Sequence, residues 1–298
     1  MYAQHTTNTA RTPDSVPKLT TTPNHNPKPQ HPNQKSTIIH HFPMIQIQHD
    51  GAVATITLSN PDKRNALSPD MLNALNDAVT ACNADNSVHV IVLAAQGKVF
   101  CAGADLKYMQ QIRNNGAFEN LEDSEVMMRT FKNIYTSPKI IVASVQGDAI
   151  AGGCGLVTLC DYVVAASTAR FGFTEVAIGF VPALVGVLAL RKIGEARARH
   201  ILLRANIFDA NHAKELGLVY EVCEPHELEH RTNTLVQELA KHPRTSIALT
   251  KKLLVHVQDV DVFSGLDYAA GVNALSRQTE GFRTGIDAMI ERISGNKK

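Results

Sequence analysis

The chain has 298 residues, with 29 lysines and arginines against 28 acidic residues and a formal net charge of +1 at neutral pH. This length suffices for one large domain or two small ones, and the near-zero charge argues against a polyanion as the main partner. No apolar run is long enough to cross a bilayer. The five scattered cysteines include no CxxC pair, which indicates reduced thiols and no disulfide framework.

Residues 1–43 differ in composition from the rest of the chain. They hold seven of the 13 prolines and four basic residues against one acid, Asp14, which gives them a charge of +3. Such a segment cannot bury enough apolar surface to offset the entropy of ordering it. We therefore expect a disordered tail over 1–43. It lacks the apolar centre of a secretory signal, and its proline density argues against the amphipathic helix of a transit peptide.

From Met44 to about residue 223, strand and helix patterns alternate. Strands are expected over 45–49, 53–58, 89–95, 140–145 and 162–166, and helices from Ser68, after the loop 99–106, over 120–135 and over 183–192. Ser68 provides a capping hydroxyl, and Pro69 suits the first helical position. The alternation favours an α/β architecture over 44–224. Only helical patterns follow, over 226–241, 244–257, 261–277 and 280–293, so a helical region is expected over 225–298.

Two glycine-bearing turns, CAGAD (101–105) and AIAGG (149–153), each follow a buried strand and lead into a helix. A helix N-terminus offers free N–H groups at the positive end of the helix dipole, and small residues let a ligand reach the main chain. Two such donors on one oxygen would form an oxyanion hole, worth about 3–4 kcal/mol per donor. Close helix–strand packing explains the glycines equally well, so both interpretations stay open at this point.

Glu175 is the only ionisable residue in the twenty-residue segment 171–190. Burial raises the pKa of a carboxyl group, and a carboxyl that titrates near neutrality can take up and return protons. A surface glutamate at a helix start is an equally good interpretation of this residue taken alone.

Other catalytic patterns are absent or unconvincing. HELEH (226–230) matches the HExxH zinc pattern, but the helix that it opens is expected to bury Leu228, Leu235 and Leu239, which places both histidines on the solvent side. The sequence has no GxxxxGK[ST], GxGxxG or GxSxG motif. We therefore expect no metal site, no phosphate or dinucleotide loop and no serine nucleophile.

Four segments resemble, in order and spacing, the signatures of the crotonase (enoyl-CoA hydratase/isomerase) superfamily. They are NPDKRNALS (60–68), FCAGADLKYM (100–109), VQGDAIAGGCGL (145–156) and FGFTEVAIGFVPA (171–183). The resemblance covers about residues 44–298. It implies a crotonase-like spiral of ββα units over 44–224 and a C-terminal helical trimerisation region over 225–298, in homotrimers or homohexamers. It also implies an acyl-CoA thioester substrate, with coenzyme A as part of the substrate and no separate cofactor.

The resemblance also implies roles for individual positions. The N–H groups of Ala104 and Gly152 would hold the thioester oxygen as it becomes an enolate, and Glu175 falls on the family's acid/base glutamate. Residues expected to bind coenzyme A or line its path are Lys63, Ala66, Ala102, Asp105, Leu106 and Lys107. Met289 and Arg292 lie where the family closes the coenzyme A pocket, sometimes across a subunit boundary. Residues that could shape an acyl pocket, or equally form ordinary core, are Met109, Met127, Met128, Phe131 and Phe180.

One departure from the family pattern bears on the reaction. Where hydratases often carry a second glutamate, this chain has Gly155. A single-glutamate site suits a Δ3,Δ2-enoyl-CoA isomerase, in which Glu175 takes a proton from C2 and returns it to C4. The segments that follow Gly155 and Ala104 are nevertheless similar to bacterial hydratases of branched or carboxylated enoyl-CoAs. We expect an enoyl-CoA hydratase, with the isomerase as the alternative.

A third interpretation is a non-catalytic scaffold or RNA-binding relative. It would need no ionisable group at position 175, and RNA binding would need a basic stripe, whereas residues 44–298 carry a charge of −2. We therefore expect no nucleic-acid and no membrane partner. The reduced cysteines favour the cytoplasm, with the mitochondrial matrix as the alternative if the tail is a targeting segment.

Overall fold

The computed structural model describes residues 39–42 and 44–295. The chain divides into Met1–Lys35 and Ser36–Lys298, and every described residue belongs to the second of these units. Most of the tail predicted over 1–43 therefore lies outside the described residues. Residues 39–42 were included in that prediction, but they form strand β1.

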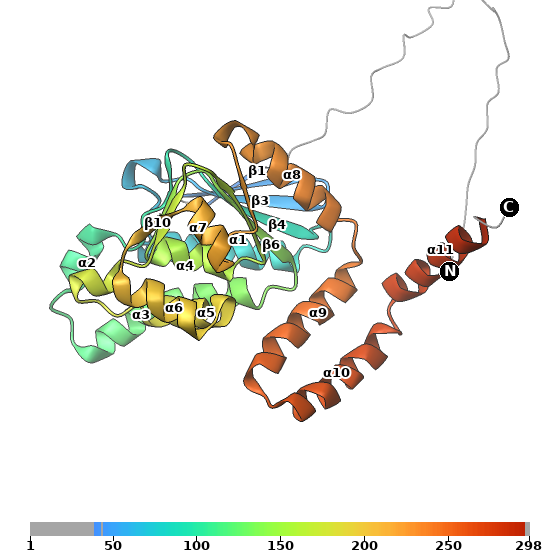
Figure 1. Ribbon diagram of the computed structural model, residues 1–298. Helices are drawn as coiled ribbons and strands as arrows, with labels where there is room; N and C mark the ends of the chain where they lie inside the picture. Colours follow the sequence, from blue (N-terminus) through green and yellow to red (C-terminus); the bar gives the residue numbers. More distant parts are fainter. Residues whose placement is uncertain (1–38, 43, 296–298) are drawn as a thin grey trace, which may run out of the picture. The chain divides into compact units, whose positions relative to one another are not determined.

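A seven-stranded sheet runs through the described unit in the order β1-β2-β3-β4-β6-β8-β11 (Figure 1). Its strands are β1 (Ile39–Phe42), β2 (Ile45–Asp50), β3 (Val53–Leu58), β4 (Val90–Ala95), β6 (Ile140–Val145), β8 (Tyr162–Ala166) and β11 (Glu221–Cys223). The first three strands pair antiparallel, and all later neighbours pair parallel. The parallel strands are nearly continuous apolar runs because both of their faces are covered.

A second sheet has four strands of three residues each, in the order β10-β9-β7-β5. They are β5 (Val99–Cys101), β7 (Asp148–Ile150), β9 (Arg170–Gly172) and β10 (Ile207–Asp209). The pairs β5–β7 and β7–β9 are parallel, and β10 is antiparallel to β9. Since β5 and β7 each end at one of the glycine-bearing turns, this sheet brings the two turns together. The prediction of a loop over 99–106 was wrong for β5, because three residues are too few for a recognisable alternation.

Eleven α-helices occur among the described residues. They are α1 (Pro69–Ala84), α2 (Leu106–Ile112), α3 (Ala117–Tyr135), α4 (Gly152–Leu159), α5 (Ala183–Ile193), α6 (Glu195–Arg204), α7 (Ala210–Leu216), α8 (Leu228–Leu239), α9 (Arg244–His256), α10 (Val262–Ser276) and α11 (Glu280–Gly295). As expected, α1 starts at Pro69, and the Ser68 hydroxyl accepts a hydrogen bond from the Met71 N–H. The described part of the chain after β11 is helical, which agrees with the helical patterns predicted from residue 226.

The core lies on both faces of the large sheet, and the alternation along its strands divides it. Val90 and Val92 of β4 belong to one apolar cluster, whereas Ile91 and Leu93 belong to the other, as the two-residue period of a strand requires. Helix α8 packs on the face that carries Val90 and Val92. Helices α1 and α4 pack on the opposite face, which carries Ile91 and Leu93. All five cysteines are buried, which confirms that they are core residues.

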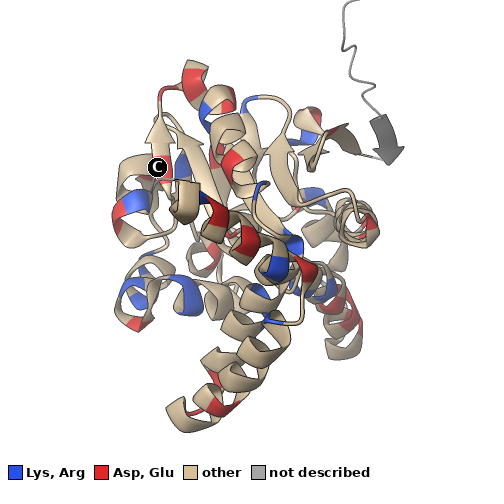
Figure 2. Cartoon of the chain, turned by 90° about the vertical axis from the view of Figure 1, so that its right-hand side faces the viewer, with Lys and Arg blue, Asp and Glu red and all other residues tan. Residues whose placement is uncertain are grey.

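Within residues 39–42 and 44–295, the helices are all too short or too polar to span a membrane. On the side shown in Figure 2, basic and acidic residues are intermixed, so this side carries no basic stripe.

Candidate functional site

The two glycine-bearing turns approach each other so closely that side chains are excluded. Gly103 has a φ of +85°, and a Cβ atom there would lie 2.8 Å from the Ile150 carbonyl oxygen and 3.4 Å from the Gly152 nitrogen. A Cβ atom on Gly153 would lie 2.2 Å from the carbonyl oxygen of Cys101. The close packing that the sequence suggested as one explanation is therefore present. It also places the main chain of Gly103 against that of Gly152.

Two N–H groups beside this contact make no hydrogen bond to another described residue. Gly152 is the first residue of α4, and N–H groups in the first turn of a helix have no partner within the helix. Among the hydrogen bonds of the described residues, none is donated by the main-chain N–H of Gly152 or of Ala104. Ala151, between β7 and α4, has φ 51° and ψ −122°, which is strained for a residue with a side chain. Both amides are available to an acceptor from outside the chain.

A buried asparagine that the sequence analysis missed fixes the neighbouring loop. The Asn65 side chain donates to the main-chain carbonyls of Gln96 and Val99, both at 2.9 Å, and its Oδ1 accepts from the Asn60 N–H at 2.9 Å. Asn65 is fully buried and has a φ of 51°, a left-handed conformation that asparagine adopts more readily than most residues. Most asparagines are exposed, so this residue gave no signal in the sequence.

Main-chain hydrogen bonds join this loop to the Gly103 turn. The Ala102 N–H donates to the Arg64 carbonyl at 3.1 Å, and the Leu67 N–H donates to the Gly103 carbonyl at 2.7 Å. The loop and the turn therefore form one continuous surface. It contains four of the residues expected to contact coenzyme A, namely Lys63, Ala66, Ala102 and Asp105.

The polar residues expected around coenzyme A gather at the start of α2. Asp105 caps this helix by accepting from the N–H groups of Lys107 and Tyr108, and its Oδ2 lies 4.0 Å from the Lys63 Nζ. The Lys63 and Lys107 side chains are exposed, as is that of Leu106. Two lysines thus lie beside a surface that carries a free main-chain amide.

Glu175 is a buried carboxyl, as one interpretation of its apolar surroundings required. It is the first residue of the short 3₁₀ helix η2 (Glu175–Ile178), after β9, and its side chain is 7% exposed. Its Oε2 has no hydrogen-bond partner among the described residues. Burial raises the pKa of Glu175 because the charged form loses hydration, and a hydrogen bond from the main-chain N–H of Glu175 itself offsets this rise only in part. The carboxyl is also within electrostatic reach of Cys154 in α4, whose thiol pKa is raised mainly by burial and further by the Glu175 charge.

The surroundings of Gly155 leave no room for a side chain. A Cβ atom there would lie 2.4 Å from the Val185 Cγ1 and 3.3 Å from the ring of Phe131. Met127, also on α3, reaches the start of α4, since its Cε lies 3.1 Å from the position of a Cβ on Gly152. Of the five residues suggested for an acyl pocket or core, only Phe131 is fully buried.

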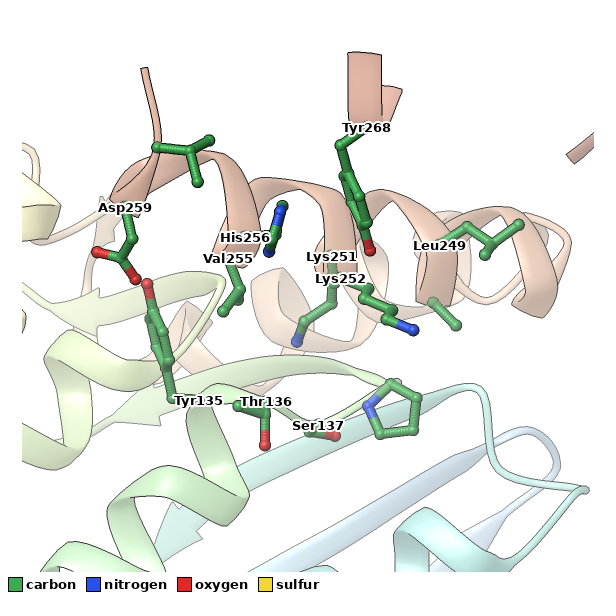
Figure 3. A pocket seen from close by; sticks show the side chains of 13 residues that line it. Tyr135, Thr136, Ser137, Leu249, Lys251, Lys252, Val255, His256, Asp259 and Tyr268 are labelled. Atoms are coloured by element: carbon green, nitrogen blue, oxygen red, sulfur yellow. The ribbon is translucent and has the colours of Figure 1, made fainter. Parts of the chain in front are cut away.

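Two other features of the described residues lie away from this site. His226 and His230 are exposed on α8 and the turn before it, which confirms the solvent-facing side predicted for them. No cluster of three or more potential metal ligands occurs in residues 39–42 and 44–295. A cavity of about 620 Å³ lies between α9, α10 and the segment after α3, with Tyr135, Lys251 and Tyr268 among its lining residues (Figure 3). None of the predicted site residues lines it.

Comparison with known proteins matches residues 48–296 to the model of the family described as enoyl-CoA hydratase/isomerase. A Thermus thermophilus protein whose name places it provisionally among the enoyl-CoA hydratases is 42% identical over 249 residues, which cover 84% of this chain and 98% of that protein. The crotonyl-CoA hydratase of Syntrophomonas wolfei is 31% identical over 85% of this chain and 96% of its own length.

A third relative, the 2,3-dehydroadipyl-CoA hydratase of Escherichia coli, is 30% identical over 80% of this chain and 92% of its own length. Among solved structures, an enoyl-CoA hydratase from Mycobacterium smegmatis matches with a TM-score of 0.80 and 32% identity. The match covers 84% of this chain and 97% of that one. The fold is therefore that of crotonase structures, with two mixed sheets and C-terminal helices, as predicted.

Replacement of Gly153 by alanine tests the close contact between the turns. Its Cβ would meet main-chain atoms of Cys101, which cannot move aside cheaply, so we expect Gly153→Ala to lower the free energy of unfolding by about 3 kcal/mol or more. Gly186→Ala in α5 is the matched control, because its Cβ would meet only the Leu202 Cδ1 at 3.7 Å. Gly186→Ala should raise the free energy of unfolding by about 0.5–1 kcal/mol. Urea unfolding measures both, and equal effects would contradict the contact.

The burial of Glu175 predicts a pH-dependent stability. A carboxyl whose pKa is raised in the folded state binds its proton more tightly there than in the unfolded chain, so the folded state loses stability as pH rises through the raised pKa. At pH values above that pKa, we expect the free energy of unfolding of Glu175→Gln to exceed that of the wild type by about 1–2 kcal/mol. The free energies of unfolding of the two proteins should converge at about pH 4, below the ordinary pKa of glutamate. Glu229→Gln, at an exposed position of α8, is the control. Parallel pH curves for wild type and Glu175→Gln would contradict the expectation.

Proposed function

The chain belongs to the enoyl-CoA hydratase/isomerase family, and we propose that it is a hydratase-type lyase that adds water across the double bond of a 2-enoyl-CoA. The observation that carries the proposal is the buried carboxyl of Glu175, whose Oε2 has no hydrogen-bond partner among the described residues. This carboxyl acts electrostatically on Cys154 of α4, the helix whose first N–H makes no hydrogen bond to another described residue. The relatives named as hydratases of crotonyl-CoA and 2,3-dehydroadipyl-CoA support hydration as the reaction. Membership in the family implies an acyl-CoA substrate, and coenzyme A enters as part of it.

In the proposed mechanism, the thioester oxygen accepts hydrogen bonds from the N–H groups of Ala104 and Gly152. Negative charge develops on this oxygen when C3 is attacked, and each preorganised donor stabilises it by about 3–4 kcal/mol. The positive end of the α4 dipole acts in the same direction. Lys63 and Lys107 would bind the coenzyme A phosphates as point charges, since both side chains are exposed beside the free amide of Ala104.

Glu175 would move the proton. Its carboxylate takes a proton from a water molecule as the water oxygen bonds to C3, and the electrons of the C2=C3 bond pass to the thioester oxygen. The enolate then returns its electrons to C2, which takes the proton held by Glu175. One water is added, and the carboxylate is restored. A raised pKa suits a group that must accept a proton and return the same proton.

The packing at Gly155 supports isomerisation as a second candidate. Val185 and Phe131 fill the space beside the Gly155 Cα, so a second carboxyl at this position is excluded unless Val185 moves. Glu175 alone is sufficient for a Δ3,Δ2-enoyl-CoA isomerase, in which it takes a proton from C2 of a 3-enoyl-CoA and returns it to C4 of the dienolate. A non-catalytic scaffold is disfavoured, because a scaffold needs no ionisable group at position 175, and burial of a carboxyl whose Oε2 has no hydrogen-bond partner among the described residues costs stability.

We also propose that the chain forms homotrimers or homohexamers through its C-terminal helices. Gly265 is the only buried residue of helices α10 and α11. Their large exposed apolar side chains are Val262, Phe263, Leu266, Leu275, Phe282, Ile286, Met289, Ile290 and Ile293. So much exposed apolar surface is typical of helices that a partner subunit covers. In that arrangement Met289 would be placed to close a coenzyme A pocket.

A panel of thioesters tests the reaction. We expect loss of the conjugated thioester absorbance with 2-enoyl-CoAs, and Glu175→Gln should lower kcat at least about 100-fold because its amide cannot act as a base. Glu229→Gln serves as the control. Since the carboxylate form is required, kcat/KM should rise with pH through a pKa above the ordinary glutamate range. Gain of absorbance from 3-enoyl-CoAs alone would instead establish the isomerase, and an inert wild type on both classes would overturn the family chemistry.

The mass in solution tests the proposed assembly. Light scattering should give three or six times the 32.4 kDa of one chain. Ile290→Glu places a charge in the exposed apolar face of α11 and should dissociate the oligomer. A monomeric wild type at micromolar concentration would contradict the assembly.

Finally, we propose a cytoplasmic location, supported by five buried cysteines that are all free. The mitochondrial matrix is the alternative. Imaging of a C-terminal fluorescent fusion distinguishes the two compartments.

A further inference from the structure

The first turns of α4 are bordered by apolar side chains. A Cβ on Gly152 would lie 3.1 Å from the Met127 Cε, and a Cβ on Gly155 would lie 3.3 Å from the Phe131 ring. The side chains that border these two glycines are Leu67, Met127, Phe131 and Val185. Among these four, Met127 is half-buried and the others are buried. Met127 is therefore the apolar side chain beside the Gly152 amide that keeps surface for contact with a ligand.

The chain that follows Glu175 carries no charge. The Phe180 N–H donates to the Glu175 carbonyl at 3.0 Å, so the turn between them folds back on Glu175. Residues 176–190 contain no ionisable side chain. Large apolar side chains of this turn and the residue after it are exposed, namely Ile178, Phe180 and Val181. On this side too, the chain offers hydrocarbon and no cation.

The charged groups near the carboxyl and near Met127 are acidic. Burial and a main-chain hydrogen bond account for the pKa of Glu175, to which no lysine or arginine of the described residues contributes. The part of the chain that leads to Met127, residues 114–128, has no basic residue and four acids, Glu119, Glu122, Asp123 and Glu125. Arg129 is exposed and two residues after Met127, so it lies on the opposite side of α3. Lys63 and Lys107 belong to the loop and the helix on either side of Ala104, where the proposed mechanism assigns them to coenzyme A.

This distribution of charge bears on the acyl group of the substrate. In a 2,3-dehydroadipyl thioester the free carboxylate is C6, three bonds beyond the C3 atom that water attacks. Glu175 has to reach that water, so the substrate carboxylate would lie near the Glu175 carboxylate. Without a cation it would lose hydration, and its charge would disfavour the ionised form that Glu175 needs as a base.

We propose that the site selects an uncharged aliphatic acyl group, and that Met127 is a specificity-determining residue of its wall. This inference rests on the proposed function, because it takes the acyl chain to begin between the Gly152 amide and Glu175. An aliphatic chain gains apolar burial against Met127 and leaves no charge unpaired. The unbranched thioether side chain adapts its shape, so straight and branched chains are both accepted.

Two substrates of equal carbon number test the selection. In 2-hexenoyl-CoA the C6 atom is a methyl group, and in 2,3-dehydroadipyl-CoA it is a carboxylate. We expect kcat/KM for 2-hexenoyl-CoA to be at least about 100-fold higher, the effect of an uncompensated charge in the site. Calorimetry with the saturated analogues hexanoyl-CoA and adipyl-CoA should give the same order of affinity, whichever reaction the protein catalyses.

Met127→Lys tests the assignment to the wall. It keeps an unbranched side chain and adds a cation, so it should lower the preference for 2-hexenoyl-CoA at least about tenfold through a charge-assisted bond to the carboxylate. Met127→Leu should keep the preference. Glu125→Gln is the matched control, because it changes the net charge by the same one unit at an exposed position on the opposite side of α3.

Equal kcat/KM for the two substrates in the wild type would overturn the selection, and hydration of both would leave the proposed function standing. An unchanged preference in Met127→Lys, or an equal change in Glu125→Gln, would overturn the role of Met127. A wild type that hydrates neither substrate would overturn the proposed function. In that case tighter binding of hexanoyl-CoA than of adipyl-CoA would still support the selection, and equal binding would overturn it as well.

Discussion

The contact between the main chain of Cys101 and Gly153 is the constraint on which the candidate site depends. It allows no Cβ at position 153 and, through the neighbouring turn, none at Gly103. Two segments about fifty residues apart in sequence can meet backbone to backbone only because these positions are glycine. Beside this meeting, the amides of Ala104 and Gly152 have no acceptor among the residues that the structure describes. The buried side chain of Asn65 fixes the loop beside this contact through hydrogen bonds to Gln96 and Val99. The pairing of strands β5 and β7 aligns the two segments that meet there.

Several unfavourable features lie close together along the chain around this contact. The non-glycine backbone at Ala151 is strained, and the first amide of α4 is unpaired. Among the described residues, the buried side-chain atoms without a hydrogen-bond partner are the Glu175 Oε2 and the Asn206 Oδ1. In most folded proteins nearly all buried polar groups are paired. The unpaired amides of Ala104 and Gly152 and the unpaired Oε2 of Glu175 are polar groups that a polar ligand could satisfy, which is why we interpret this region as functional.

Much of the fold could be predicted from the sequence, and the exceptions have physical causes. Strands β3, β6 and β8 were predicted with their observed bounds, β3 from the alternation of its residues and β6 and β8 from their buried apolar runs. The three-residue strands of the second sheet escaped detection, since main-chain pairing with neighbours defines them and side-chain pattern does not. In the site, the isolation of Glu175 in an apolar segment left burial and a surface position as equal interpretations, and the structure has the residue buried. Asn65 gave no such signal, because its importance comes from main-chain partners that lie more than thirty residues away in the sequence.

The central claim is that the amides of Ala104 and Gly152 polarise one thioester carbonyl. The infrared stretch of that carbonyl, isolated by carbon-13 labelling of a bound saturated acyl-CoA, measures this polarisation directly. Hydrogen bonds from two preorganised donors withdraw electrons from the carbonyl bond and weaken it. We predict a band at clearly lower frequency in the complex than for the free ligand in water. A bound ligand whose band stays at or above the frequency of the free thioester would contradict the account.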